Sequence, residues 1–228
     1  LKTVNLIMEK YGTIPPKFTK QWWSYFWDYY KIHTISICAA AVLIGTTVYQ
    51  CATQTKYDLS VSYIGTQDIT EEQQAKLSEI ITPQIDEITG NKEIDIDYMT
   101  YPINPNNTDK SASEYEYAMQ MKYTAELQAG TTDLYIMSRD NAESNKTYAD
   151  CFTDISELTD NADDVLTDDS GRAYAVSLKN SRALKEAGID SSDMYLSLRL
   201  LFEMNEKKDE YVLNHENALK AAKLLLEE

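Results

Sequence analysis

The pattern of hydrophobic positions separates one long apolar stretch from a region of short, periodic segments. Residues 32–52 read IHTISICAAAVLIGTTVYQCA and contain no Asp, Glu, Lys or Arg. A helix of this length rises about 30 Å, at ~1.5 Å per residue, which matches the hydrocarbon core of a bilayer. We therefore expect a single transmembrane helix over residues 32–52.

An aromatic and basic segment comes directly before this stretch. Residues 22–30 contain three Trp, three Tyr and one Phe, and Lys17, Lys20 and Lys31 flank them. Aromatic rings concentrate at membrane–water interfaces, and segments rich in lysine stay on the cytoplasmic side. A buried core helix has no need of such a flank. The sequence therefore predicts that residues 1–31 face the cytoplasm.

The same segment favours an uncleaved signal-anchor over a cleaved signal. A signal peptide has a shorter basic region before its apolar stretch and small residues at its cleavage site. A lipoprotein signal is also disfavoured, because Tyr49 and Gln50 stand where small residues precede the modified cysteine, here Cys51. We thus expect residues 53–228 to form an extracellular domain.

The outer region alternates between strand-like and helix-like periodicity. Residues 57–64, 93–99 and 132–137 are rich in β-formers and predict three strands. A capping box at Thr70 opens a helix expected to run to Ile88, and a second helix is expected over Ser113–Ala129. Strands separated by helices of this length pair in parallel through right-handed crossovers. The first strand lies between the other two if the chain reverses direction after the second strand.

The part of the chain after residue 137 adds further elements. We expect a short helical stretch near 142–148, an acidic loop at 160–169, a fourth strand over 173–178, and amphipathic helices over 193–205 and 216–226. The expected fold class is α/β: one transmembrane helix followed by a single three-layer lobe with a mostly parallel sheet.

Charge and cysteines narrow the range of partners. The formal net charge is −16, but residues 1–31 hold five lysines and two acidic residues, so the rest of the chain carries −19. Such an acidic domain repels nucleic acid. Cys51 and Cys151 could form a disulfide on an oxidising face, although the pattern alone favours two unpaired cysteines over a pair.

Sequence motifs for catalysis and cofactor binding are missing. The chain contains no GxSxG, HExxH, GxxxxGK[ST] or GxGxxG, and its two histidines are His33 and His215. The acidic loop lacks the spacing of an EF-hand, so a solvated loop is the favoured interpretation over a Ca²⁺ site. We expect no enzyme activity, no cofactor and no metal site.

Three segments resemble extracellular solute-binding proteins of bacterial uptake transporters. YTAELQAGTTDLYIM (123–137) resembles their helix–Ala-Gly–Asp–strand passage, CFTDISEL (151–158) the segment that follows, and GRAYAVSLKNSRALKEAGI (171–189) their Gly-x-x-Tyr-x-x-Pro strand. With its anchor, the chain is also similar to small single-pass membrane proteins of Clostridia-type bacteria. The resemblance implies the fold of a first lobe, but Ser177 replaces the expected Pro and too little chain follows for a second lobe.

This resemblance and the strand pattern give two functional hypotheses. The first is a membrane-anchored, solute-binding-like module that holds a small ligand or peptide at the carboxyl ends of the strands, where open parallel sheets bind. Its candidate binding residues are Thr66, Tyr101, Ser138 and Asp140. The alternative is a non-catalytic structural or interaction subunit of a membrane complex.

Overall fold

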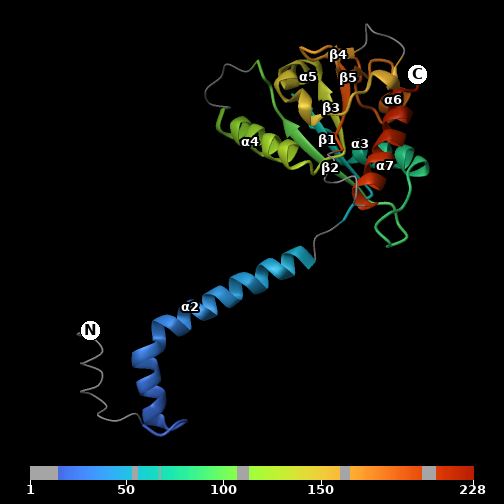
Figure 1. Cartoon of the computed structure of the whole chain (residues 1–228). Helices are drawn as coiled ribbons and strands as arrows, with labels where there is room; N and C mark the ends of the chain where they lie inside the picture. Colours follow the sequence, from blue (N-terminus) through green and yellow to red (C-terminus); the bar gives the residue numbers. More distant parts are fainter. Residues whose placement is uncertain (1–14, 53–55, 67, 107–112, 160–164, 202–208) are drawn as a thin grey trace. The chain divides into compact units, whose positions relative to one another are not determined.

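The computed structural model describes residues 15–52, 56–66, 68–106, 113–159, 165–201 and 209–228. They belong to two compact units, Leu1–Thr55 and Lys56–Glu228. Figure 1 shows a long helix in the first unit and a sheet covered by helices in the second.

The first unit is built on helix α2, Lys20–Ala52. Thr19 caps its start, because the Thr19 hydroxyl oxygen accepts a hydrogen bond of 3.2 Å from the backbone N–H of Trp22. The helix therefore begins well before Ile32, where the apolar stretch starts. Among the described residues, α2 is the one helix that is long and apolar enough to cross a membrane.

The polar side chains inside the apolar stretch bond to the helix itself. The hydroxyls of Thr46 and Thr47 both donate to the carbonyl of Leu43 at 2.9 Å. These hydrogen bonds remove most of the free-energy cost of placing a hydroxyl group in hydrocarbon.

The second unit is organised around a sheet of six strands, as far as the described residues show, in the order β2-β1-β3-β6-β5-β4. β1 lies between β2 and β3 and is parallel to both, as predicted. The pairs β3–β6, β6–β5 and β5–β4 are antiparallel, so the α/β sheet is mixed rather than mostly parallel. The strands are β1 Leu59–Gly65, β2 Ile96–Pro102, β3 Leu134–Ser138, β4 Val165–Thr167, β5 Ala173–Ser177 and β6 Met194–Leu198.

The largest difference from the sequence prediction is strand β6. The helix expected over 193–205 is wrong, because Met194–Leu198 forms a central strand between β3 and β5. Its side chains alternate between the two faces, and both faces are covered. Ser197 and Arg199, which look like the polar side of an amphipathic helix, are in fact buried.

The first helix of the domain ends earlier than expected. Thr70 forms the predicted capping box with Gln73, whose backbone N–H donates to the Thr70 hydroxyl at 3.3 Å. Helix α3 then runs only over Glu71–Ile81. Pro83 has no backbone N–H to continue the α-helical hydrogen bonds, and the chain continues as the 3₁₀ turn η1, Thr82–Gln84.

Other boundaries also shift. β2 begins three residues later than the predicted strand 93–99, and β4 lies in the expected acidic loop, of which residues 160–164 are outside the described part. The short helical stretch is α5, Arg139–Ser144, followed by the 3₁₀ helices η2, Asn145–Cys151, and η3, Ser156–Leu158. The last helix, α7, spans Asp209–Leu226.

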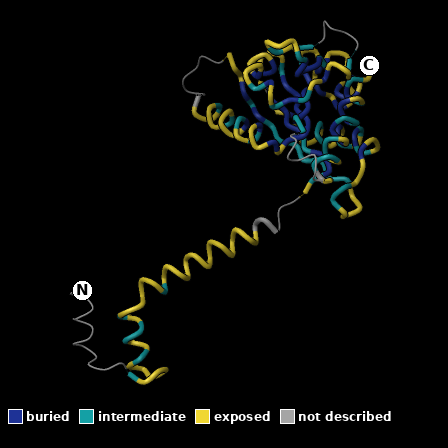
Figure 2. The backbone as a smooth tube through the Cα atoms, in the orientation of Figure 1, coloured by how far each residue is buried: buried dark blue, intermediate teal, exposed yellow. Residues whose placement is uncertain are grey.

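Helices cover both faces of the sheet, and each face has its own core (Figures 1 and 2). The face under α3, α6 (Arg182–Glu186) and α7 is aliphatic. The face under α4 (Ser113–Ala129), α5 and η2 is aromatic. The rings of this second core contact one another in series, at centroid distances of 5.4–6.4 Å: Tyr101, Tyr123, Tyr135, Phe152 and Tyr174.

A buried ion pair joins the parallel and antiparallel halves of the sheet. Arg199 Nη2 lies 2.7 Å from Asp133 Oδ1, with the side chains 4% and 6% exposed. The other carboxylate oxygen of Asp133 accepts a hydrogen bond of 3.0 Å from the backbone N–H of Ser60. Burial raises the pKa of Asp133, although Arg199 and Ser60 oppose that rise. The ion pair therefore buries two charged groups, and their attraction offsets the free-energy cost of removing them from water.

We predict that Arg199→Met alone lowers the free energy of unfolding of fragment 56–228 by ~3–5 kcal/mol, because it leaves a buried carboxylate without its partner. The double variant Asp133→Asn/Arg199→Met should regain part of this loss, since a neutral amide still accepts from Ser60. Urea unfolding followed by circular dichroism measures both. A double variant as unstable as the single one would contradict a charge-based origin.

Candidate functional site

The four residues expected to bind a ligand lie at one edge of the sheet, beside a groove that other residues line. β1 and β2 end in register, Gly65 beside Pro102, and Ile64 pairs with Met137 of β3. The residues that follow these strands therefore lie at the same edge. Thr66 and Asp140 are exposed, Ser138 is half-buried and Tyr101 is buried.

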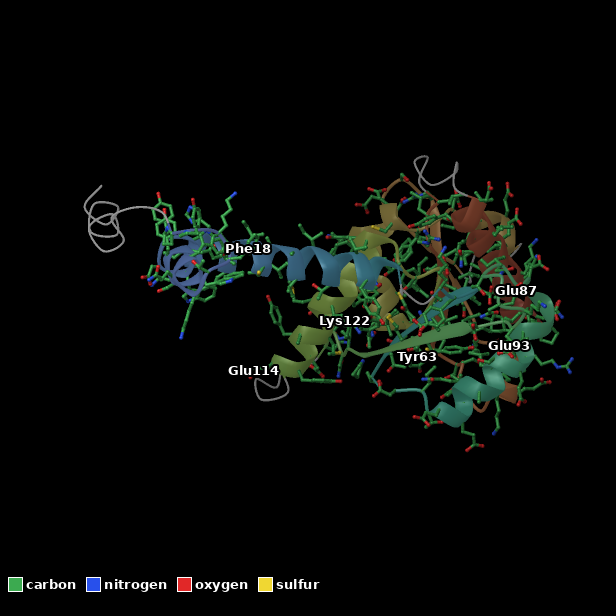
Figure 3. The ribbon with its side chains drawn as sticks, turned by 90° about the horizontal axis from the view of Figure 1, so that it is seen from below. Phe18, Tyr63, Glu87, Glu93, Glu114 and Lys122 are labelled. Carbon is green, nitrogen blue, oxygen red and sulfur yellow. The ribbon has the colours of Figure 1, made fainter. Side chains whose placement is uncertain are left out.

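Tyr101 is turned towards α4 rather than towards solvent. Its hydroxyl donates a hydrogen bond to the carboxylate of Glu126, and the ammonium of Lys122 lies 5.5 Å from the ring centroid. Figure 3 shows Lys122 on α4. Burial, together with Glu126, raises the pKa of Tyr101. The side chain thus fastens α4 to β2, and its hydroxyl is already bonded.

The other polar candidates hold loops together at this edge. The side-chain amide of Asn141 donates to the hydroxyl oxygen of Ser138 and to the carbonyl of Ile103, both at 2.9 Å. Asp140 accepts a hydrogen bond of 2.7 Å from the side chain of Asn106. The loop after β2 is therefore fixed to the start of α5.

This fixed loop forms one wall of a groove of about 320 Å³. Helix α4 forms the second wall, and α5 with η2 forms the third. That volume is at the lower end of the range for small-molecule sites. The lining residues are Ile103, Asn104 and Pro105 from the loop, Glu116, Tyr117, Gln120, Tyr123 and Thr124 from α4, and Asn141, Ser144, Asn145 and Tyr148 from α5 and η2.

The floor of the groove is rigid and its rim is open. The hydroxyl of the buried Tyr123 accepts a hydrogen bond of 2.8 Å from the amide of Asn145, which is also buried. Burial raises the pKa of Tyr123 well above its ordinary value, so this phenol stays neutral. At the rim Tyr148 is half-buried and Tyr117 is 64% exposed.

The lining is polar and aromatic, and it is uncharged except at one residue. Glu116 is the one charged side chain among the residues that line the groove. Amide and hydroxyl groups can both donate and accept, and tyrosine rings offer flat apolar faces. These groups can hold a neutral ligand that carries hydroxyls or amides. They offer no cation to pair with an anionic ligand.

Sequence reasoning missed this groove, although a signal was present. Asn141, Asn145 and Tyr148 recur at i, i+4 and i+7, and Tyr117, Gln120 and Thr124 recur at i, i+3 and i+7. Each set places polar or aromatic groups on one side of a helical segment. That the two sides face each other depends on the path of the loop after β2.

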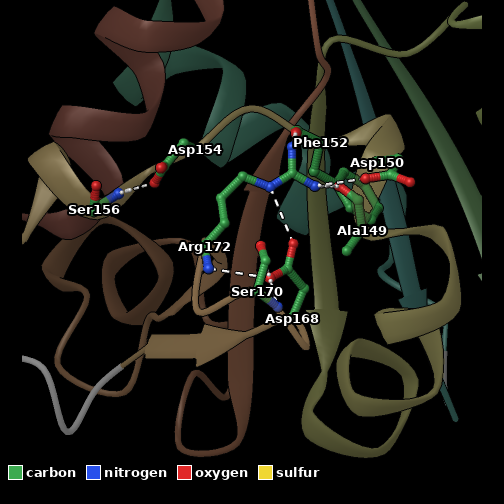
Figure 4. A network of polar contacts seen from close by, with 8 residues as sticks. All are labelled: Ala149, Asp150, Phe152, Asp154, Ser156, Asp168, Ser170 and Arg172. Atoms are coloured by element: carbon green, nitrogen blue, oxygen red, sulfur yellow. Dashed lines mark hydrogen bonds and ion pairs between the residues drawn. The ribbon is translucent and has the colours of Figure 1, made fainter.

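A second polar cluster is structural (Figure 4). Asp168 Oδ1 accepts hydrogen bonds from the Ser170 hydroxyl at 2.6 Å and from the Arg172 backbone at 3.0 Å, while Asp168 Oδ2 accepts from Arg172 Nε at 3.1 Å. Arg172 Nη2 also donates to the carbonyl of Ala149 at 2.7 Å. The cluster fastens the β4–β5 hairpin to η2, and the carboxylate of Asp168 is fully engaged.

Metal ligands do not gather in the part of the chain that the structure describes. No group of three or more His, Cys, Asp or Glu side chains meets there. Cys151 is a free thiol, half-buried, and burial raises its pKa. The side chain of Cys51 lies outside the described residues.

Comparison of the chain with protein-family models, with curated proteins and with solved structures finds no match.

We predict that Asp168 stabilises the domain in a pH-dependent way. The hydroxyl of Ser170, the backbone N–H groups and Arg172 hold the pKa of Asp168 far below its usual value of about 3.9. Its contribution is present above the unfolded pKa and is lost as pH falls through the folded pKa. The urea midpoint of Asp168→Asn should fall below wild type at neutral pH, and the gap should shrink below about pH 4. A gap that stays constant into acid would contradict the prediction.

Proposed function

We propose that the chain is a membrane-anchored binding module with an extracellular domain. Residues 1–31 lie on the cytoplasmic side, residues 32–52 cross the membrane as part of α2, and the domain from Lys56 onward lies outside. The length of α2 and the lysines before its apolar part support this topology. The anchor keeps the binding site at the cell surface.

The groove between α4 and α5–η2 is the proposed binding site. The observation that carries this is its lining: tyrosine rings and neutral amides and hydroxyls around a space of about 320 Å³, above a floor fixed by the Tyr123–Asn145 hydrogen bond. Flat rings pack against the C–H face of a sugar, while amides bond to its hydroxyls. We infer a neutral, hydroxyl-rich ligand of the size of a small saccharide.

The resemblance to solute-binding proteins fits this site in part. The parallel order β2-β1-β3 and its helices are what a first lobe requires. The groove, however, is formed within the single lobe and beside the strand ends. Tyr101, Ser138 and Asp140 would then act from behind the groove, by holding its walls, rather than by contact with the ligand.

A scaffold function has one observation in its favour. Helix α4 exposes large side chains outside the groove, with Tyr115 61% and Met121 54% exposed. Such a surface suits a protein partner within a membrane complex. The groove and this surface share α4, so adjacent substitutions on the same helix can separate the two functions.

For the topology, we predict that a cysteine placed at the exposed Ser192 is labelled on intact cells by a membrane-impermeant maleimide. The background replaces Cys38, Cys51 and Cys151 with Ser. A cysteine at Lys17 should react only after the cells are lysed. The reverse pattern would place the domain in the cytoplasm.

For the groove, we predict that the full-length protein in detergent micelles binds a neutral oligosaccharide from a panel tested by calorimetry. Tyr117→Ala should weaken binding by roughly two- to tenfold, because an aromatic contact contributes about 0.5–1.5 kcal/mol. Tyr115→Ala removes the same ring two positions away on α4, outside the groove, and should bind like wild type.

Two results would reject the groove as a saccharide site. One is that no neutral saccharide binds, and the other is that both tyrosine variants bind like wild type. If Tyr115→Ala and Met121→Ala instead release a co-purifying membrane protein that Tyr117→Ala retains, the scaffold function is supported.

A further inference from the structure

The first three turns of α2 are strongly amphipathic. At about 100° per residue, the seven aromatic side chains between Trp22 and Tyr30 cover an arc of roughly 200°. The polar side chains span roughly 100° of the remaining arc, which holds no aromatic residue. The polar residues are Lys20, Gln21, Ser24, Asp28 and Lys31.

The aromatic rings form a continuous apolar surface. Trp22 and Phe26 stack with centroids 5.4 Å apart, and Phe26 and Tyr30 stack at the same distance. Tyr25 and Tyr29 stack beside this ladder at 6.0 Å. The surface is open, since Trp23 and Trp27 are each 54% exposed. Figure 3 shows Phe18 at its start.

The length of α2 leaves these turns outside a straight membrane span. Residues 32–52 already match the hydrocarbon core, whereas the whole helix of 33 residues is about 50 Å long. A straight continuation would place either the aromatic surface in cytoplasmic water or Lys20 and Asp28 in hydrocarbon. Both are unfavourable. Figure 1 shows α2 as two straight pieces that meet at a bend, the N-terminal piece being the shorter.

We propose that residues 20–31 form an interfacial helix that lies in the plane of the membrane, with its aromatic arc buried at the headgroup–acyl boundary. The partner is the bilayer that the following residues cross, so the inference rests on the proposed anchoring. A helix with a wide apolar arc and lysines on its polar side is typical of this location. The bend turns the chain from the membrane plane into the span.

The lysines of this segment favour membranes with anionic lipids. Lys20 and Lys31 lie on the polar arc, and Lys17 comes three residues before the helix. Asp28 is the one acidic residue of this arc. Lysines at this level attract anionic headgroups. The segment should therefore bind a leaflet rich in phosphatidylglycerol more deeply than one of phosphatidylcholine alone.

Tryptophan fluorescence of the full-length protein tests the orientation directly. The chain has three Trp, at positions 22, 23 and 27, so its tryptophan signal comes from this segment alone. Variants that replace two of the three with Phe leave one reporter each. The protein is reconstituted in vesicles of phosphatidylcholine and phosphatidylglycerol, and quenching by lipids brominated at different acyl depths gives the depth of each ring.

The two orientations give opposite orders of depth. In an in-plane helix, Trp22 and Trp23 lie near the centre of the aromatic arc and Trp27 near its edge, so Trp27 is the shallowest. In a helix that continues the span, Trp27 is the deepest, by about 6–7 Å over four to five residues. A deepest Trp27 overturns the proposal. Failure of the protein to float with the vesicles would instead reject the anchoring itself.

A matched pair of substitutions gives a second test. Phe26→Glu puts a charge at the centre of the aromatic arc and should move the tryptophan emission to longer wavelength, with several-fold stronger quenching by aqueous iodide. Gln21→Glu adds the same charge on the polar arc and should leave both readouts as in wild type. Equal responses of the two variants would overturn the amphipathic orientation, while flotation confirms that each variant is still in the membrane.

Discussion

The ion pair between Arg199 and Asp133 is the contact on which the rest of the domain depends, because it lies where the sheet changes direction. The carboxylate of Asp133 accepts a hydrogen bond from the backbone N–H of Ser60 in β1. The backbone carbonyl of Asp133 accepts another, of 3.0 Å, from the backbone N–H of Arg199. The Arg199 guanidinium also lies 5.3 Å from the ring centroid of Tyr211 on α7. One charge pair therefore sets the register between β1, β3 and β6 and positions the helix that closes the aliphatic face. A well-packed apolar pair of equal volume could match its stability, but it would lose this directional register.

The same contact explains where sequence reasoning succeeded and where it failed. Strands β1 and β2 could be predicted from their local alternation, and β3 from a short apolar run that follows the helix stop at Gly130. β6 could not, because Ser197 within it is buried and Arg199 just after it pairs with Asp133, which is far away in sequence. Leu196 and Leu198 alternate with Ser197 and Arg199, which is a strand pattern. A polar residue between leucines is also typical of an amphipathic helix, so the local sequence allows both structures. Only the presence of Asp133 beside Arg199 makes the strand interpretation consistent.

The sequence placed the candidate site at the carboxyl ends of β1, β2 and β3, and the groove lies beside that edge but is lined by other residues. The rule that ligands bind at the carboxyl ends of parallel strands pointed to Tyr101 and Ser138. In the structure these side chains bond to Glu126 and Asn141, and so position the walls of the groove. The residues that line it come from helix sides whose mutual distance depends on the loop after β2. The hydrogen bonds that fix this loop, such as the one from Asn141 to Ile103, join residues far apart in sequence, so a local sequence pattern does not predict them.

The charge of the domain and the neutrality of the groove together restrict what can bind. The chain beyond residue 31 carries −19, so an anionic ligand is repelled before it reaches the groove and finds no cation inside it. A cationic ligand is attracted to the whole surface, and Glu116 alone would have to select it at this site. A neutral ligand is indifferent to the field, and its affinity depends on ring contacts and hydrogen bonds alone. The groups in this groove can therefore give specificity to a neutral ligand. The acidic surface, which repels anions, favours the same class of ligand.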